Sequence, residues 1–131
     1  GRFVPDFANM ANNCAINFTV SIYETSFSAD EAVKAMIDLI REPSLPLGIV
    51  GPPTSASSIP TALVAGTLEL PIVSFWATST ELDQDQYKRF MRTIPTDADV
   101  ADSICRYWSS LGYKHVAILF ENDGYGEAYK E

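Results

Sequence analysis

Cysteine and histidine are scarce in this sequence of 131 residues, which contains two Cys and one His. Zinc and other metal sites usually need clustered Cys and His ligands, and Cys14, Cys105 and His115 do not have that spacing. Too few cysteines are present for a disulfide-dense scaffold. We expect no metal site, and we expect the two cysteines to be buried thiols, with a mutual bridge as the alternative.

Basic residues are also few, because nine Lys plus Arg face 17 Asp plus Glu and give a formal net charge of −8. Proteins that bind nucleic acids usually carry clustered basic side chains, whose binding to phosphates releases counterions. No cluster of Lys and Arg occurs in this sequence. The composition therefore argues against nucleic acids and anionic membrane surfaces as partners.

Long hydrophobic runs are missing, since no apolar stretch approaches the roughly 20 residues that span a bilayer. We expect neither a membrane-spanning helix nor a signal peptide within the sequence, so any membrane anchor would lie outside it. Hydrophobic residues still make up 47% of the chain, which is enough for one core of ordinary size. Residues 17–19 also fit the acceptor pattern for N-glycosylation at Asn17, which would suit a secreted domain.

Short apolar runs alternate with amphipathic segments along most of the chain. Strands separated by helices are usually joined as parallel strands through right-handed crossovers. This order predicts an α/β fold, in which helices pack on a parallel sheet. We expect helices over residues 3–12, 28–42, 57–70 and 97–112, and strands over residues 16–22, 47–50, 71–75, 90–94 and 116–120.

Three local signals mark where the predicted helices begin. Residues 28–31 match a capping box, with Ser28 as the N-cap. Pro60 suits the first turn of a helix that starts near Ser57, because its missing N–H is not needed there. Asp97 is the predicted N-cap of the next helix, which Gly112 closes.

Ligands of open α/β sheets bind beyond the carboxyl ends of the strands, so the segments after Val50, Phe75 and Phe120 are the candidate sites. Residues 54–58 follow the first of these strands. Their hydroxyls, with the free N–H groups at the start of a helix, could hold a carboxylate or a phosphate, and Ser55 is the best single candidate. The same hydroxyls also suit an N-capping role, and that reading stays open.

Residues 123–126 follow the last predicted strand and contain two glycines around Tyr125. The glycines would let the backbone turn sharply and present the Tyr125 ring to a cleft, although an ordinary turn with a packed tyrosine is the alternative. Catalytic patterns are missing: no serine lies in a GxSxG elbow, no Walker or GxGxxG motif occurs, and His115 begins a predicted strand. We expect a chain that is not an enzyme and needs no cofactor.

Four segments, taken in order, resemble the receptor ligand-binding region family, which includes metabotropic glutamate receptors, natriuretic peptide receptors and bacterial leucine-binding proteins. The similarity extends from about Ile16 to Glu131. Residues 111–116 also resemble the family's LGW-x-x-V segment, which leads into a strand. The four segments are Gly48-Ile49-Val50-Gly51-Pro52, Ala77-Thr78-Ser79, Phe90-Met91-Arg92-Thr93-Ile94-Pro95-Thr96-Asp97 and Asp123-Gly124-Tyr125-Gly126-Glu127.

The resemblance implies a periplasmic-binding-protein type I fold, in which two α/β lobes joined by a hinge close on a ligand. Residues 1–91 would then be part of the first lobe and residues 92–131 the start of the second. The implied function is an extracellular or periplasmic sensor that binds an amino-acid-like small molecule and biases an attached membrane module. A soluble solute-binding protein of a transporter and an α/β enzyme fragment are the alternatives. Ligand identity and homodimerisation stay open.

The resemblance also implies roles for individual residues. Ser55 would hold the α-carboxylate of an amino-acid ligand, and Thr78 would contact its α-amino group. Asp97 and Tyr125, from the second lobe, would meet the ammonium by charge and by a cation–π contact. Trp76 stands where the glutamate receptors carry a small residue whose backbone N–H helps to bind the carboxylate.

Overall fold

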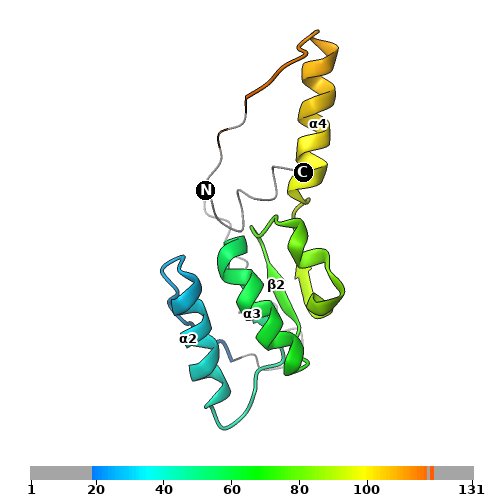
Figure 1. The fold of residues 1–131 in the computed structure, drawn as a ribbon. Coiled ribbons are helices and arrows are strands. Elements are labelled where there is room, and N and C mark those ends of the chain that lie inside the picture. The colour runs from blue at the N-terminus through cyan, green and yellow to red at the C-terminus, as the bar shows by residue number, and fades with distance from the viewer. Residues whose placement is uncertain (1–18, 118, 120–131) are drawn as a thin grey trace, which may run out of the picture.

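The computed structural model describes residues 19–117 and 119. Helices and short parallel strands alternate along these residues, with two 3-10 helices between the second and third strands (Figure 1). In chain order the elements are α2 (Ala29–Ile40), β1 (Ile49–Val50), α3 (Ser55–Thr67), β2 (Ile72–Ser74), η1 (Thr80–Asp83), η2 (Asp85–Tyr87), β3 (Phe90–Arg92) and α4 (Asp97–Ser110).

The three strands form a parallel sheet in the order β1-β2-β3. Ile72 of β2 lies opposite Ile49 and Phe90, and Val73 lies opposite Val50 and Met91. Parallel neighbours that are close in sequence need a crossover, and α3 supplies it between β1 and β2. The predicted α/β architecture with a parallel sheet is therefore confirmed, although each strand is shorter than its apolar run.

The core lies between the sheet and the layer formed by α2 and α3, which run side by side (Figure 1). Ile72 is fully buried, and Ala62 and Ala65 on α3 are buried with it, because small side chains let a helix approach closely. Burying a side chain such as that of Ile72 contributes about 1.5–3 kcal/mol to stability. Around them the core also contains Met36, Leu39, Leu70, Ala77, Leu82 and Tyr87.

The opposite face of the sheet is open within residues 19–117. Successive side chains of a strand point to opposite faces, so Val50, Val73 and Met91 share the face that α2 and α3 do not cover. Val50 is 84% exposed and Met91 is 50% exposed. One face of the sheet is thus a packed core, and the other is an apolar surface.

α2 begins after Ser28 as the sequence predicted, but its first turn is not capped in the predicted way. Ser28 is the N-cap, yet its side chain makes no capping bond to the helix, so the predicted capping box is wrong. The Ser28 hydroxyl instead donates to the Asp30 carboxylate, and this bond holds the pKa of Asp30 below its usual value. Before it, Ser26 and Phe27 form a tight turn with φ angles of +48° and +57°.

The predicted starts of α3 and α4 are also corrected. Thr54 caps α3, and its hydroxyl accepts the Ser57 N–H at 3.2 Å, so the helix begins at Ser55 and Pro60 lies inside it, beyond the first turn. Thr96, not Asp97, caps α4, because Thr96 and Asp99 form a reciprocal capping box. In both cases a threonine that precedes the predicted start, by three residues in α3 and by one in α4, satisfies a helical N–H group.

The far end of α4 was predicted correctly. Gly112 has a φ of +84°, and the Tyr113 N–H donates to the Trp108 carbonyl at 3.1 Å, as in a Schellman motif. The helix points away from the layer of α2 and α3 (Figure 1). Cys105 on α4 is exposed and not buried, which corrects one of the two predicted buried thiols.

Two of the predicted strands are not formed by those of their residues that the structure describes. Residues 19–22 and 116–117 have no regular secondary structure, which corrects the described parts of two predicted strands. Between β2 and β3, where no helix was predicted, the chain forms η1 and η2. The other parts of the predicted strands, the predicted helix over residues 3–12, Cys14, Asn17 and Tyr125 lie outside the described residues.

Candidate functional site

The carboxyl ends of β1 and β2 are fastened to each other by serine hydroxyls. Ser74, the last residue of β2, donates to the Pro52 carbonyl at 2.7 Å and accepts the Ala77 N–H at 3.1 Å. Ser58 of α3 donates to the same Pro52 carbonyl at 3.0 Å. The segments that follow the two strands are thus held together at the edge where an α/β sheet binds ligands.

Ser55 joins the start of α3 to the segment after β2. Its Oγ atom accepts the Thr78 N–H at 3.2 Å and the Ser79 N–H at 3.1 Å, and the residue is only 1% exposed. A hydroxyl can accept two hydrogen bonds and still donate one. The Ser55 proton is therefore the part of this hydroxyl that remains for a further acceptor.

Thr78 lies at the centre of this arrangement. Its N–H is bound to Ser55, and its carbonyl accepts the Asp97 N–H at 3.0 Å. Its Oγ1 atom is buried and has no hydrogen-bond partner within residues 19–117. Buried polar atoms are nearly always hydrogen-bonded, so Thr78 Oγ1 is a candidate hydrogen-bond partner for a polar atom of a ligand.

Arg92, at the end of β3, holds the same segment from the other side. Its Nη1 atom donates to the Ser79 carbonyl at 2.9 Å and to the Ala77 carbonyl at 3.4 Å, while Nη2 pairs with the Asp83 carboxylate. The side chain is only 10% exposed, and its guanidinium lies 5.6 Å from the centre of the Phe90 ring. Arg92 and Ser74, which pair in the sheet, were not predicted as site residues from the sequence.

The other predicted site residues fall in different surroundings. Asp97 is 1% exposed at the start of α4, and its backbone reaches Thr78. Trp76 is 61% exposed, and its N–H donates to Ser74 Oγ at 3.4 Å. The structure therefore brings Ser55, Thr78 and Asp97 together through backbone contacts and places Trp76 two residues along the chain from Thr78.

Tyr87 carries the one clearly perturbed ionisable group of the core among the described residues. Burial raises the pKa of its phenol, and the hydrogen bond that its hydroxyl donates to Glu81 at 3.1 Å raises it further. Both effects oppose a negative charge on the ring oxygen. The described residues contain no cluster of His, Cys, Asp or Glu that could hold a metal ion, and no helix among them is long and apolar enough to cross a membrane.

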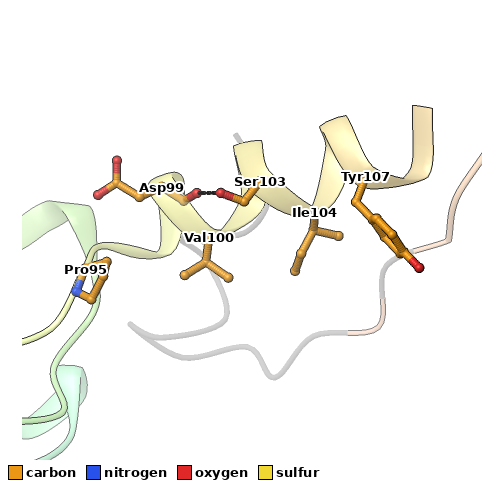
Figure 2. A pocket seen from close by; sticks show the side chains of 6 residues that line it. All are labelled: Pro95, Asp99, Val100, Ser103, Ile104 and Tyr107. Carbon is orange, nitrogen blue, oxygen red and sulfur yellow. Dashed lines mark hydrogen bonds between the residues drawn. The ribbon is translucent and has the colours of Figure 1, made fainter. Parts of the chain in front are cut away.

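A separate hollow of about 390 Å³ runs along α4 (Figure 2). The Ser103 hydroxyl at its rim donates to the Asp99 carbonyl at 2.9 Å, so that bond already has both partners within the helix. The hollow is open and mainly apolar, and it does not include Ser55, Thr78 or Arg92. Its lining consists of Pro95, Asp99, Val100, Ser103, Ile104 and Tyr107.

Known proteins resemble this chain over most of its length. Metabotropic glutamate receptor-like protein E of Dictyostelium discoideum is 33% identical over 102 residues, which are 77% of this chain and 12% of that protein. Metabotropic glutamate receptor 8 of Homo sapiens is 25% identical over 115 residues, which are 87% of this chain and 13% of the receptor. The chain thus spans about an eighth of the length of these relatives.

Among solved structures, an ABC transporter substrate-binding protein from Desulfitobacterium hafniense has a TM-score of 0.72 to this chain. The two are 21% identical, and the match covers 85% of this chain and 33% of the other. At that identity the likeness concerns the fold, and it confirms the periplasmic-binding-protein architecture. Residues 4–130 match the family described as "Receptor family ligand binding region". The chain belongs to this family of receptor ligand-binding regions.

Proposed function

We propose that this chain is part of an extracellular sensor domain of a membrane receptor, which binds a small amino-acid-like ligand between two lobes and signals when the lobes close. Family membership and the glutamate-receptor relatives support this class of function. The observation that carries the proposal is the hydrogen bonding of Ser55 to the backbone of Thr78 and Ser79. It joins the segments that follow β1 and β2 around a buried threonine hydroxyl, which has no hydrogen-bond partner among the described residues.

In this proposal residues 1–91 belong to the first lobe and residues 92–131 to the second. The direction of α4, which leaves the layer of α2 and α3, supports a division near β3 (Figure 1). Residues 93–96 would then form part of the hinge. A ligand that touches both lobes favours the closed form by its difference in affinity for the two forms, and closure biases the attached membrane module.

The ligand's carboxylate would receive the Ser55 proton, and its amino group would contact Thr78. Asp97 and Tyr125 would meet the ammonium from the second lobe. Ser55 is nearly fully buried, so we expect it to act partly by fixing Thr78 in place. A soluble solute-binding protein that serves a transporter is the second candidate, and the likeness to a substrate-binding protein favours it. A membrane-spanning segment encoded in the same gene would decide for the receptor.

The test is a thermal-shift screen of the complete two-lobed ectodomain against the common amino acids. A ligand at a hundred times its Kd should add about 2.7 kcal/mol to the free energy of unfolding. We expect the double variant Ser55→Ala with Thr78→Ala to lose this shift. The variant Thr67→Ala, which alters an exposed threonine at the other end of α3, should keep it. No stabilisation by any amino acid would overturn the proposal.

A further inference from the structure

We infer that the site selects amino acids with an apolar side chain, aromatic ones in particular. Three exposed aromatic residues at the carboxyl edge of the sheet would contact that side chain: Phe27, Phe75 and Trp76. The inference rests on the proposed function, because it concerns the side chain of the same ligand.

All three residues lie at the carboxyl edge of the sheet. Phe75 and Trp76 directly follow β2, and Phe27 precedes α2 by two residues. The chain leaves the far end of α2 to enter β1 at the amino edge, so the beginning of α2 lies at the carboxyl edge. Figure 1 shows α2 and α3 side by side and running in the same direction. The turn with Phe27 is therefore at the same end as Ser55 and Thr78.

Phe27 has a backbone conformation that a phenylalanine rarely adopts. Its φ is +57°, next to a φ of +48° at Ser26, and the turn is closed by the Ser28 N–H, which donates to the Thr25 carbonyl at 2.8 Å. Gly and Asn are the ordinary residues for such a turn, and a bulky residue there is an outlier. The ring is 66% exposed, so the core that the described residues form does not explain this conformation. Such outliers often mark functional contacts.

Phe75 and Trp76 belong to a segment whose backbone is held by hydrogen bonds to serine side chains. Phe75 is 52% exposed and Trp76 is 61% exposed, although large rings normally supply buried area in a folded domain. Ser74 Oγ accepts the N–H groups of Trp76 and Ala77, and Ser55 accepts the N–H of Thr78. The rings are thus carried beside Thr78 on a rigid support, which is suited to contact with a ligand.

The edge segments carry no charge that would favour an acidic or basic ligand side chain. Residues 25–28, 51–56 and 75–80 contain no Asp, Glu, Lys, Arg or His. The nearby Arg92 is engaged with the Asp83 carboxylate and with two carbonyl oxygens. Within these described segments, the groups offered to a ligand side chain are therefore rings and hydroxyls, which favour burial of apolar area.

The test is isothermal titration calorimetry of the complete ectodomain with phenylalanine, leucine, glutamate, lysine and glycine. Glycine reports on the backbone groups alone. We expect phenylalanine to bind about tenfold more tightly than glycine or better, and more tightly than glutamate or lysine. The variants Phe27→Asn and Phe75→Ala should weaken phenylalanine binding about tenfold and leave glycine binding unchanged. Asn fits the left-handed turn, so Phe27→Asn should fold.

Ile37→Ala is the control, because Ile37 is a 45% exposed apolar residue in the middle of α2, away from the edge. It should change none of the affinities. Tighter binding of glutamate or lysine than of phenylalanine would overturn the inference and leave the proposed function standing. Phenylalanine binding that is unaffected by either edge variant would also overturn it. Failure of every amino acid, glycine included, would overturn the proposed function itself. If Phe75→Ala does not fold, Phe27→Asn alone decides.

Discussion

Ser55 illustrates how much one hydroxyl fixes at the candidate site. The backbone of residues 77–79 has no regular secondary structure, yet its polar groups are bonded on every side. Ser55 accepts two of the N–H groups, and Asp97 donates to the Thr78 carbonyl. The Thr78 hydroxyl is thereby held in one place without the support of a helix or a strand.

Ser55→Ala should therefore destabilise the fold as well as impair binding. Two N–H groups would lose a buried acceptor, and each such loss costs about 1–3 kcal/mol. We expect the free energy of unfolding of the ectodomain to fall by about 2 kcal/mol or more in urea denaturation. Ser110→Ala, which removes an exposed hydroxyl bonded to the Tyr107 carbonyl, is the control and should cost less than about 0.5 kcal/mol. Equal losses in the two variants would contradict the role of Ser55.

Tyr87 should make stability depend on alkaline pH. The pKa of its phenol is raised in the folded protein, so the folded state holds the proton more tightly than the unfolded state does. This contribution is fully present below pH 10, the ordinary pKa, and is lost as the pH rises through the higher folded value. We expect the melting temperature of Tyr87→Phe to fall less between pH 9.5 and about 11 than that of the unchanged protein.

The Tyr87→Phe variant also loses the hydrogen bond to Glu81, so its stability at neutral pH should be about 1 kcal/mol lower. The comparison therefore uses the slope with pH and not the absolute melting temperature. Tyr113→Phe, at a position 63% exposed, is the matched control and should follow the unchanged protein. Parallel slopes for all three proteins would show that Tyr87 does not cause the alkaline loss.

At the scale of elements, the Arg92 side chain connects the end of β3 to the segment between β2 and β3 that contains η1. The pattern of β3 places Arg92 on the same face as Phe90, which is the side of the core. Its guanidinium meets two carbonyls and the Asp83 carboxylate, so the end of one strand fixes the segment that follows another. A planar group with several donors is needed for this geometry, and Lys does not provide it.

Arg92→Lys and Arg92→Gln should each lower the free energy of unfolding by about 2 kcal/mol, because buried carbonyls lose charged donors. Asp83→Asn should cost less, since the Asp83 side chain is 55% exposed and the pair is partly screened. Arg106→Gln on α4 is the control, because its pair with Asp102 is exposed. Chemical denaturation of the ectodomain measures all four. A loss in Arg106→Gln as large as that in Arg92→Gln would refute the assignment.

The sequence predicted elements better than it predicted their ends and contacts. Apolar runs located β1, β2 and β3, because a buried parallel strand is apolar on both faces. The start of α3 was predicted near Ser57 and the cap of α4 at Asp97, whereas the caps are Thr54 and Thr96, because neighbouring Ser, Thr and Asp residues are all good caps and only the geometry decides between them. Ser55 was found from its place after a strand, but its partners lie 23 and 24 residues away and no local pattern indicates them.

At the scale of the whole molecule, apolar surface remains open on both sides of the candidate hinge. Val50 and Met91 lie exposed on one sheet face, and Ile104 and Tyr107 line the hollow on α4 (Figure 2). An α/β sheet of parallel strands is normally covered on both faces. Because the chain spans about an eighth of its relatives, we expect the remainder of a two-lobed domain to cover this surface.

If the remainder of the domain covers this surface, one double variant should act differently in the 131-residue chain and in the complete ectodomain. Made alone, the chain should bind the dye ANS strongly, and Val50→Lys with Met91→Lys should reduce the fluorescence, because both side chains are exposed there. In the complete ectodomain the same double variant should instead lower the free energy of unfolding by several kcal/mol, because buried lysines lose hydration. Leu45→Lys, at an exposed position before β1, should have neither effect. A double variant that leaves the ectodomain as stable as the original would show that this sheet face stays open in the two-lobed protein.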